Sequence, residues 1–384
     1  MFNFDFEPQE FEERRRRVRL AMGEAGIDLL LVLSPVNINY LIGSRTKGYQ
    51  QFQVLFFPID EGPLTFLTRT SELAETLDTC LAEDVRGWGG PTPEDPIEVA
   101  IRIMEEKGYS SLRVGLEVIN YYLGVREYER LKSFLGASLV KGASGLIDEI
   151  KFVKSASEIA YIRKAASIAD TAMDVCIDFV AAGITELSVA GEVYRAMMVE
   201  GGEMAASPMN LGSGERTCYA HPAPSEKPIA QGDFMHIEYG TAYRKYCALL
   251  GRQLCLGKPT PKMSDIFDVV RAAGDAFIAE TRAGVSANKP HVAARELTAN
   301  AGMDKYRLHT AGYGIAPAFP PMWGERLDMS EDSPYVLETG MVVSVEPPVF
   351  SYEDRLGARL VDTLLVTDTG CEILSRVTRD LIIL

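Results

Sequence analysis

Apolar and polar positions along the first 148 residues switch repeatedly between the period of a helix and that of a strand. The apolar run IDLLLVLS at residues 27–34 has the length of a buried strand, and a helical pattern precedes it. The predicted strands are residues 29–33, 52–57, 63–68 and 112–116, and the predicted helices are residues 10–26, 70–82 and 96–107. This alternation is typical of an α/β domain.

A second domain is predicted to begin near residue 149. Ser155 can cap a helix and Glu158 lies three residues later, which is the spacing of a capping box. The chain reads as helical up to about residue 200 and then becomes strand-rich, with Gly and Pro clusters at residues 222–228 and 317–321. We therefore expect one domain over residues 1–148 and another over residues 149–384.

Length and composition agree with two ordinary globular domains. A chain of 384 residues exceeds the size at which one hydrophobic core usually stops growing. The content of 47% hydrophobic and 24% charged residues is that of a folded protein, and no apolar run reaches the roughly 18 residues of a membrane span. The N-terminal stretch lacks the order of a secretory signal, so a cytoplasmic protein is expected, with no membrane partner.

Charge and cysteine usage exclude two further classes. The net charge of -15 argues against nucleic acid as a partner, because phosphate binding needs clustered Lys and Arg. The single basic run, residues 14–17, follows two glutamates and is interpreted as a solvated helix face. Six cysteines without CxxC spacing indicate reduced thiols rather than a disulfide or zinc framework.

Four ordered stretches carry a family resemblance: IKFVKSASEIAYIRKA, GSGERTCYAHPAPSEKPIAQGD, LETGMVVSVEPPVF and GARLVDTLLVT. Together they resemble the creatinase, prolidase and aminopeptidase P superfamily, and the stretch AMGEAGIDLLLVLSPVNINYLIG resembles its amino-terminal domain. The resemblance implies a fold class of an α/β N-terminal creatinase-like domain followed by an α+β pita-bread catalytic domain. It also implies a hydrolase.

Metal-dependent members of that superfamily hold two ions with five side chains, and the counterparts can be read in this chain. They fall on Glu238, Leu249, Tyr313, Glu346 and Val361. Leu and Val have no lone pair to donate, and two-metal hydrolysis requires both ions to be held. The resemblance therefore implies that no metal or other cofactor is used. A single ion held by Glu238, Glu346 and a histidine stays open as an alternative.

Within the superfamily, creatinase and ectoine hydrolase act without metal on small nitrogen compounds, and the chain most resembles this branch. The matching features are Glu238 with the run YRKYCALLGRQLCLGKP, the run GYGIAPAFPPMWGER, and the pair His221-Pro222. The resemblance implies metal-independent hydrolysis of a C–N bond in a zwitterionic, cyclic amidine or guanidino compound. The chain departs from the ectoine hydrolase pattern at Cys247 and Glu346, where that branch has histidines, so the substrate stays open.

Three residues are predicted to be catalytic. His221 matches the acid–base histidine of creatinase, and imidazole titrates near neutral pH; the alternative is a histidine that packs beside Pro222. Glu238 and Glu346 would face one site without a metal to neutralise them, so mutual repulsion and burial are expected to raise at least one of their pKa values. They could bind a cation or direct attack, or form a structural ion pair with Arg252 or Arg359.

Five residues are predicted to bind substrate. Tyr313 replaces a metal histidine and could donate a hydrogen bond, His309 could stabilise developing charge, and Trp323 could stack on a cationic ring or pack in the core. Arg252 belongs to the matching run, and Arg45 could pair with a substrate carboxylate or be a solvated loop charge. Cys247 is interpreted as an inert thiol.

Partners and competing functions follow from the same resemblance. It implies a small-molecule substrate and a homodimer in which each N-terminal domain closes the neighbouring active site, with Arg45 near that interface. An Xaa-Pro dipeptidase or aminopeptidase with an altered metal site is the second hypothesis. A non-catalytic binding module built on the same scaffold is the third.

Overall fold

The computed structural model describes residues 4–118 and 121–384, and the chain divides into two compact units after Lys151. The first unit ends close to the boundary expected at residue 148. The second unit runs from Phe152 to Leu384 and carries the family motifs. Among the described residues, no helix combines the length and hydrophobicity that crossing a bilayer requires.

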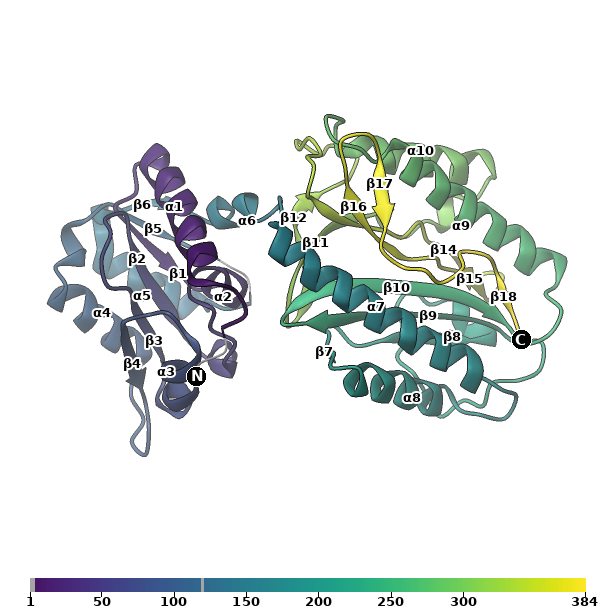
Figure 1. The fold of residues 1–384 in the computed structure, drawn as a ribbon, viewed down its shortest axis with the longest axis horizontal. Helices are drawn as coiled ribbons and strands as arrows, with labels where there is room; N and C mark the ends of the chain where they lie inside the picture. The colour runs from purple at the N-terminus through teal and green to yellow at the C-terminus, as the bar shows by residue number, and fades with distance from the viewer. Residues whose placement is uncertain (1–3, 119–120) are drawn as a thin grey trace. The chain divides into compact units, whose positions relative to one another are not determined.

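The first unit is built on one six-stranded mixed sheet with the strand order β4-β3-β2-β1-β5-β6. Its strands are β1 (Leu29–Val32), β2 (Val54–Pro58), β3 (Thr65–Arg69), β4 (Asp84–Trp88), β5 (Val114–Leu116) and β6 (Leu139–Gly142). Its helices are α1 (Pro8–Ala25), α2 (Pro35–Ile42), α3 (Leu73–Thr79), α4 (Pro96–Glu106), α5 (Val125–Leu135) and α6 (Leu146–Ile150). Helices lie on both faces of the sheet (Figure 1).

The central strand β1 explains why this sheet needs two covering layers. Leu30 and Val32 belong to the hydrophobic cluster that includes residues of α1 and α2, whereas Leu29 and Leu31 belong to the cluster on α4 and α5. Successive strand side chains point to opposite faces, so an unbroken apolar run can be stable only when both faces are covered.

The second unit contains two larger sheets and a short hairpin. One sheet has the order β18-β10-β9-β7 with β8 also paired to β9, and the other has the order β12-β11-β13-β16-β17. The strands of the first are β7 (Glu203–Met204), β8 (Asn210–Ser213), β9 (Phe234–Tyr243), β10 (Tyr246–Cys255) and β18 (Ile382–Ile383). Those of the second are β11 (Tyr313–Phe319), β12 (Met322–Asp328), β13 (Val342–Val345), β16 (Asp362–Val366) and β17 (Cys371–Ile373). The hairpin pairs β14 (Val349–Ser351) with β15 (Leu356–Ala358).

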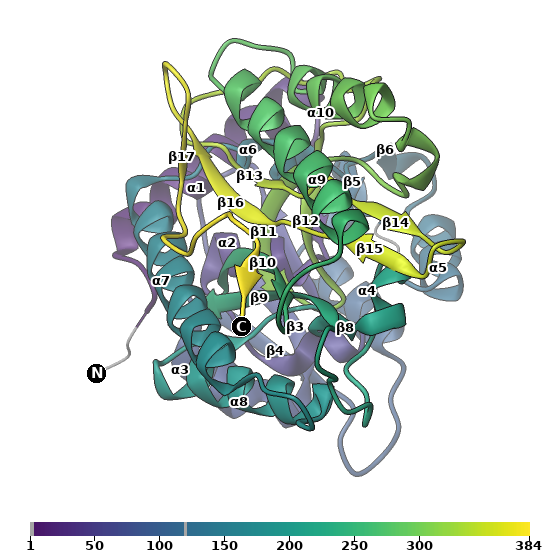
Figure 2. The same ribbon diagram turned by 90° about the vertical axis from the view of Figure 1, so that its right-hand side faces the viewer.

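Two helix pairs cover these sheets, as in a pita-bread fold. The pairs are α7 (Ala156–Phe179) with α8 (Glu186–Val199), and α9 (Pro261–Glu280) with α10 (Asn288–Asn300). Figure 2 shows α9 and α10 on one side of the strands and α7 with α8 on the other. A bridge between Gly251 and Val361 joins β10 to the segment that enters β16, so the two sheets meet near their centres.

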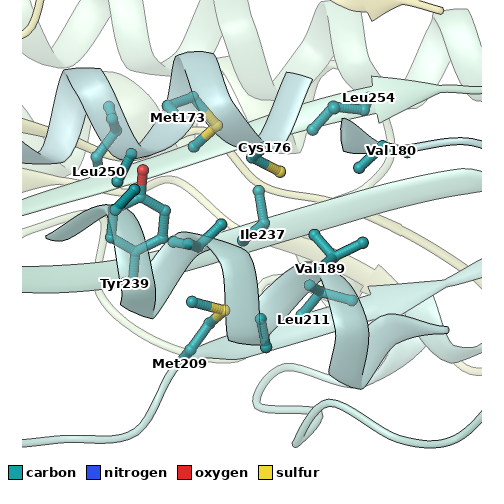
Figure 3. Close-up of a cluster of buried hydrophobic side chains, with 14 of the residues drawn as sticks. Met173, Cys176, Val180, Val189, Met209, Leu211, Ile237, Tyr239, Leu250 and Leu254 are labelled. Atoms are coloured by element: carbon teal, nitrogen blue, oxygen red, sulfur yellow. The ribbon is translucent and has the colours of Figure 1, made fainter. Parts of the chain in front are cut away.

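Strand alternation in β9 separates the core from the site. Ile237 and Tyr239 point into the cluster with α7 and α8, together with Met173, Cys176 and Leu250 (Figure 3). Glu238 lies between Ile237 and Tyr239, so its side chain points to the opposite face of the sheet. The face of β9 that the helices cover contributes to the hydrophobic core, and the opposite face carries the polar side chain of Glu238.

The local sequence signals account for several element boundaries. The predicted capping box is confirmed, because the Ser155 side chain accepts from Glu158 N and Glu158 binds the Ser155 backbone at the start of α7. Helix α1 ends at Gly26, whose φ of 70° suits glycine. The sequence prediction omitted α2, α5 and the edge strands β4 and β6. These strands carry half-buried or exposed residues, so they lack a strong apolar pattern.

Candidate active site

Glu238 lies at the centre of the polar face of β9, and its carboxylate is already bound. The carboxylate is buried and forms an ion pair with Arg359, which follows β15. Asn210 Nδ2, on the neighbouring strand β8, donates to Glu238 Oε2 at 2.9 Å. The structure therefore favours the ion-pair alternative for Glu238, with Arg359 as its partner, over a carboxylate that is free to bind a substrate cation.

Arg359 brings a positive charge into this site. Its side chain is buried, and burial lowers the pKa of its guanidinium to about 9. The guanidinium carbon lies 5.2 Å from the centre of the Phe350 ring, a distance that suits a cation–π contact. The ion pair with Glu238 and the contact with the Phe350 ring together hold the Arg359 guanidinium in place.

Two of the five positions that the family resemblance assigned to metal ligands carry aliphatic side chains, Leu249 and Val361. Val361 and Glu238 flank Gly251, since a Cβ there would lie 2.8 Å from Val361 Cγ2 and 3.4 Å from Glu238 Cβ. Leu249 is buried beside Gly240 in the same way. Within residues 4–118 and 121–384, no group of three or more His, Cys, Asp or Glu could hold a metal ion. The donor set therefore does not fit a pair of divalent ions.

Glu346 follows β13 and is the second carboxylate of the site. It is buried, and burial raises the pKa of its carboxyl to about 8, although a hydrogen bond from Tyr313 opposes this shift. Tyr313 Oη lies 3.5 Å from Glu346 Oε2, and His309 Nδ1 lies 3.8 Å from Glu346 Oε1. This shift agrees with the prediction that at least one carboxyl pKa is raised; of the two expected causes, burial and mutual repulsion, burial is the one that acts on Glu346.

Tyr313 links Glu346 to Trp323. The Trp323 indole N–H donates to Tyr313 Oη at 2.9 Å. The indole also faces Gly240, where a Cβ would lie 3.0 Å from Trp323 Cε3. Because Leu249 borders the same glycine, Trp323 lies near Leu249. Stacking of Trp323 on a substrate stays a prediction, as does substrate binding by Tyr313.

His309, which lies near Glu346, stacks on a second histidine, His221. The rings of His221 and His309 stack at 6.2 Å with an angle of 20°. His221 is exposed, whereas His309 is half-buried and its Nδ1 lies 2.8 Å from Thr310 O. Burial lowers the pKa of both rings, and Arg359 lowers that of His221 further. A neutral imidazole can accept a proton, which is the property that a general base needs.

Arg252 does not belong to this site, and its predicted role in substrate binding is wrong. Arg252 pairs with Ile237 in the ladder, so it points to the helix-covered face. It is fully buried and donates to Asp362 and to four backbone carbonyl groups. A guanidinium that is saturated in this way has no donor left for a substrate.

Arg45 lies in the other unit. Its Nη1 is 3.3 Å from Asp5 Oδ1, so its charge is already paired within the N-terminal unit. Its predicted role at an interface between subunits stays a prediction.

Cys247 borders Tyr313 in the catalytic unit. Burial raises the pKa of its thiol well above the usual range. A thiol that resists ionisation is a poor nucleophile, which favours the inert alternative.

Sequence reasoning missed Asn210 and the partner of Glu325. Asn210 pairs with Glu238 across the β8–β9 ladder, which only the register of the two strands determines. Glu325, on β12 close to Trp323, forms an ion pair with Lys154 at 2.6 Å, and both side chains are almost fully buried. Lys154 comes directly before Ser155, the first residue of the capping box of α7. A basic residue next to that motif was the sequence signal that could have indicated an ion pair.

The buried Glu346 leads to a testable prediction about stability. Its folded pKa of about 8 lies above the ordinary value for an unfolded chain, so wild-type stability falls as the pH rises between the two. The neutral amide of Glu346→Gln avoids this loss. We expect the stability of the variant relative to wild type to grow by on the order of 1 kcal/mol between about pH 6 and about pH 7. Urea unfolding across a pH series measures this, and a relative stability that shrinks with rising pH would contradict it.

Known proteins resemble the chain over nearly its whole length. The model of Metallopeptidase family M24 matches residues 160–368, and that of the Creatinase/Prolidase N-terminal domain matches residues 14–153. An Xaa-Pro dipeptidase of Pyrococcus furiosus is 27% identical, with 97% of this chain and 100% of the relative covered. An ectoine hydrolase of Halomonas elongata is 26% identical, with 98% of each chain covered. A solved Xaa-Pro dipeptidase from Bacillus anthracis has a TM-score of 0.83 and 26% identity, covering 97% of this chain and 100% of that one.

Proposed function

We propose that this chain, which belongs to metallopeptidase family M24, hydrolyses a C–N bond in a small zwitterionic compound. The proposed reaction does not use a pair of metal ions. Its membership makes it an M24-family hydrolase with a creatinase/prolidase N-terminal domain. The finer proposal concerns the substrate, which we take to be a cyclic amidine or a guanidino compound. This is the class on which an ectoine hydrolase or a creatinase would act.

One observation carries the proposal: the site contains a buried cation, Arg359, and a separate buried carboxyl group, Glu346. A pair of metal ions would instead need additional anionic ligands around it. Arg359 is paired with Glu238, whereas the polar side chains found near the Glu346 carboxyl, in the part of the chain that the structure describes, are those of Tyr313 and His309. A substrate with its own positive charge would favour the ionised form of Glu346 and would bind there. A substrate carboxylate would be attracted towards Arg359.

The residues present supply the parts of a hydrolytic reaction. Water adds to the amidine or guanidine carbon, and His221 takes the proton that the water loses, because its lowered pKa keeps it neutral. The C–N bond then breaks as the protonated His221 returns this proton to the leaving nitrogen. The added hydroxyl group loses its remaining proton to solvent as the C=O bond of the product forms. Glu346 holds the cationic group, while Tyr313 and His309 can donate to a developing negative charge.

The proposal is tested by offering the chelated protein a panel of ectoine, creatine and related amidines. Mass detection of each product identifies the compound that is cleaved and the bond that is broken. We expect one or more panel members to be consumed by the wild-type protein. Failure to consume any member, with turnover of Xaa-Pro dipeptides instead, would overturn the proposal.

The second candidate is an Xaa-Pro dipeptidase, which the names of two similar proteins favour. Leu249 and Val361 argue against it, because aliphatic side chains cannot bind a divalent ion. We expect that adding Mn, Co, Fe or Zn to chelated protein will change turnover of the identified substrate by less than about 2-fold, well below what loss of a metal-activated nucleophile produces. Strong metal-activated cleavage of Xaa-Pro dipeptides is the contrary result.

The third candidate, a binding module without activity, makes a different prediction in the same panel. Such a protein would bind a compound without consuming it, and calorimetry with wild-type protein separates binding from turnover. The stacked pair of His221 and His309 next to Glu346 favours an enzyme, because a binding pocket has no need of an acid–base group.

A further inference from the structure

Outside the site, one buried histidine contacts the segment that carries two of the site residues. His291 lies on α10, in the outer helix pair of the catalytic unit, and only 4% of it is exposed. The Ala311 backbone N–H donates to His291 Nδ1 at 3.1 Å. A backbone amide can only donate, so this ring nitrogen must be unprotonated and the imidazole must be neutral.

Ala311 is the midpoint of the segment of residues 309–313, which begins with His309 and ends with Tyr313. On its other side, Glu346 N donates to Ala311 O at 2.7 Å. Tyr313 N donates to Ser344 Oγ at 3.1 Å, so the end of the segment is fixed to β13 as well. The Ala311 peptide is thus held between α10 on one side and Glu346 on the other.

Among the described residues, the bond from Ala311 to His291 is the hydrogen bond that joins this segment to the helix pair α9 and α10, while Gly312 packs against Phe277 of α9. Ala311 is fully buried and belongs to the same hydrophobic cluster as Ala294, which lies one turn after His291 on α10. A buried N–H that loses its acceptor cannot turn to water, so the segment would have to move. Such a movement displaces His309, Tyr313 and the backbone of Glu346 together.

We propose that His291 is a positioning residue whose unprotonated Nδ1 holds the segment of residues 309–313 in place against Glu346. It touches no reacting atom and acts through Ala311. The role in turnover rests on the proposed function, whereas the role in holding the segment does not. It follows that protonation of His291 would release the segment, since a protonated ring has no free acceptor.

The charges around His291 indicate when that release would occur. Burial lowers the pKa of His291 first, and Arg307 and Arg295 lower it further, while Glu331 and Asp328 oppose them. Arg295 is itself paired with Glu331. The contact is therefore intact at neutral pH, and it is lost only as the pH falls from the ordinary histidine range towards the lowered pKa.

The decisive experiment compares His291→Asn with His291→Leu. The amide oxygen of the asparagine lies near the position of Nδ1 and can accept the Ala311 N–H without titrating, whereas the leucine cannot accept. Hydrogen exchange of the full-length protein reports directly on the segment. We expect exchange of residues 309–313 to be faster by about 10- to 100-fold in the leucine variant and unchanged in the asparagine variant.

A second measurement uses Trp323 as a reporter of the segment, because its indole donates to Tyr313. The chain has 2 tryptophans, and Trp88→Phe removes the other, which lies in the N-terminal unit. In that background we expect the Trp323 emission to shift as the pH falls below the ordinary histidine range. The same shift is expected to be absent from the protein that also carries His291→Asn.

These outcomes separate the inference from the proposed function. Equal exchange in wild-type and leucine proteins, or an asparagine variant that behaves like the leucine variant, would overturn the role of His291 whether or not a substrate is known. With a substrate in hand, we expect kcat to fall by about 10- to 100-fold in the leucine variant and to recover in the asparagine variant. If the amidine panel fails while the exchange and emission results hold, only the proposed function is rejected.

Discussion

Replacement of His221 by alanine is expected to lower kcat/KM for the cleaved compound by about 10²- to 10⁴-fold, the range that general acid–base catalysis supplies. His221 is exposed and stacks on His309, so its loss leaves no buried cavity and the fold is expected to persist. The result would identify the proton carrier of the reaction. It is measured by steady-state kinetics on the panel compound, with circular dichroism to check the fold.

The control for this variant comes from the same loop. Tyr219 is exposed and lies two residues before His221, and Tyr219→Phe removes only a hydroxyl contact with Arg355. We expect this control to keep wild-type kinetics. Added imidazole is expected to restore part of the activity of His221→Ala, because a free base can enter the exposed position. Kinetics of His221→Ala that match wild type would remove the acid–base assignment.

The second large effect is expected at Arg359. Arg359→Met leaves the Glu238 carboxylate buried with a hydrogen bond from Asn210 but without its cation, and breaking a buried ion pair on one side costs about 3–5 kcal/mol. We expect the free energy of unfolding at neutral pH to fall by about that amount. Urea denaturation measures it.

Two further variants isolate the charge from the packing. The double variant Arg359→Met with Glu238→Gln removes both charges and keeps an acceptor for Asn210, so we expect it to recover most of the lost stability. Arg376→Met breaks an ion pair with Asp174 whose side chains are 63% and 47% exposed, and it is expected to cost less than about 1 kcal/mol. A double variant as unstable as Arg359→Met would mean that packing, not charge, explains the loss.

Much of the fold follows from local signals in the sequence. The capping box at Ser155 and Glu158 marks the start of α7, and the two-sided apolar run of β1 marks the centre of the first sheet. These signals work because helix capping and strand burial depend on residues that are near each other in the chain. The edge strand β4 was not predicted, because its residues are half-buried and show no regular apolar pattern.

The sequence by itself determined the family, the two-domain organisation, and the presence of Leu249 and Val361 at positions that the resemblance assigns to metal ligands. Only the tertiary structure decided that Arg359 neutralises Glu238, that Arg252 points to the helix-covered face, and that His291 reaches Ala311. Residues 238 and 359 lie 121 positions apart, so their pairing depends on the bridge between Val361 and Gly251, which is the ladder partner of Glu238. The face on which an arginine lies depends in turn on strand register, which a one-residue shift would reverse. The sequence shows which residue types are available to the site, but tertiary packing decides which charged groups pair with one another.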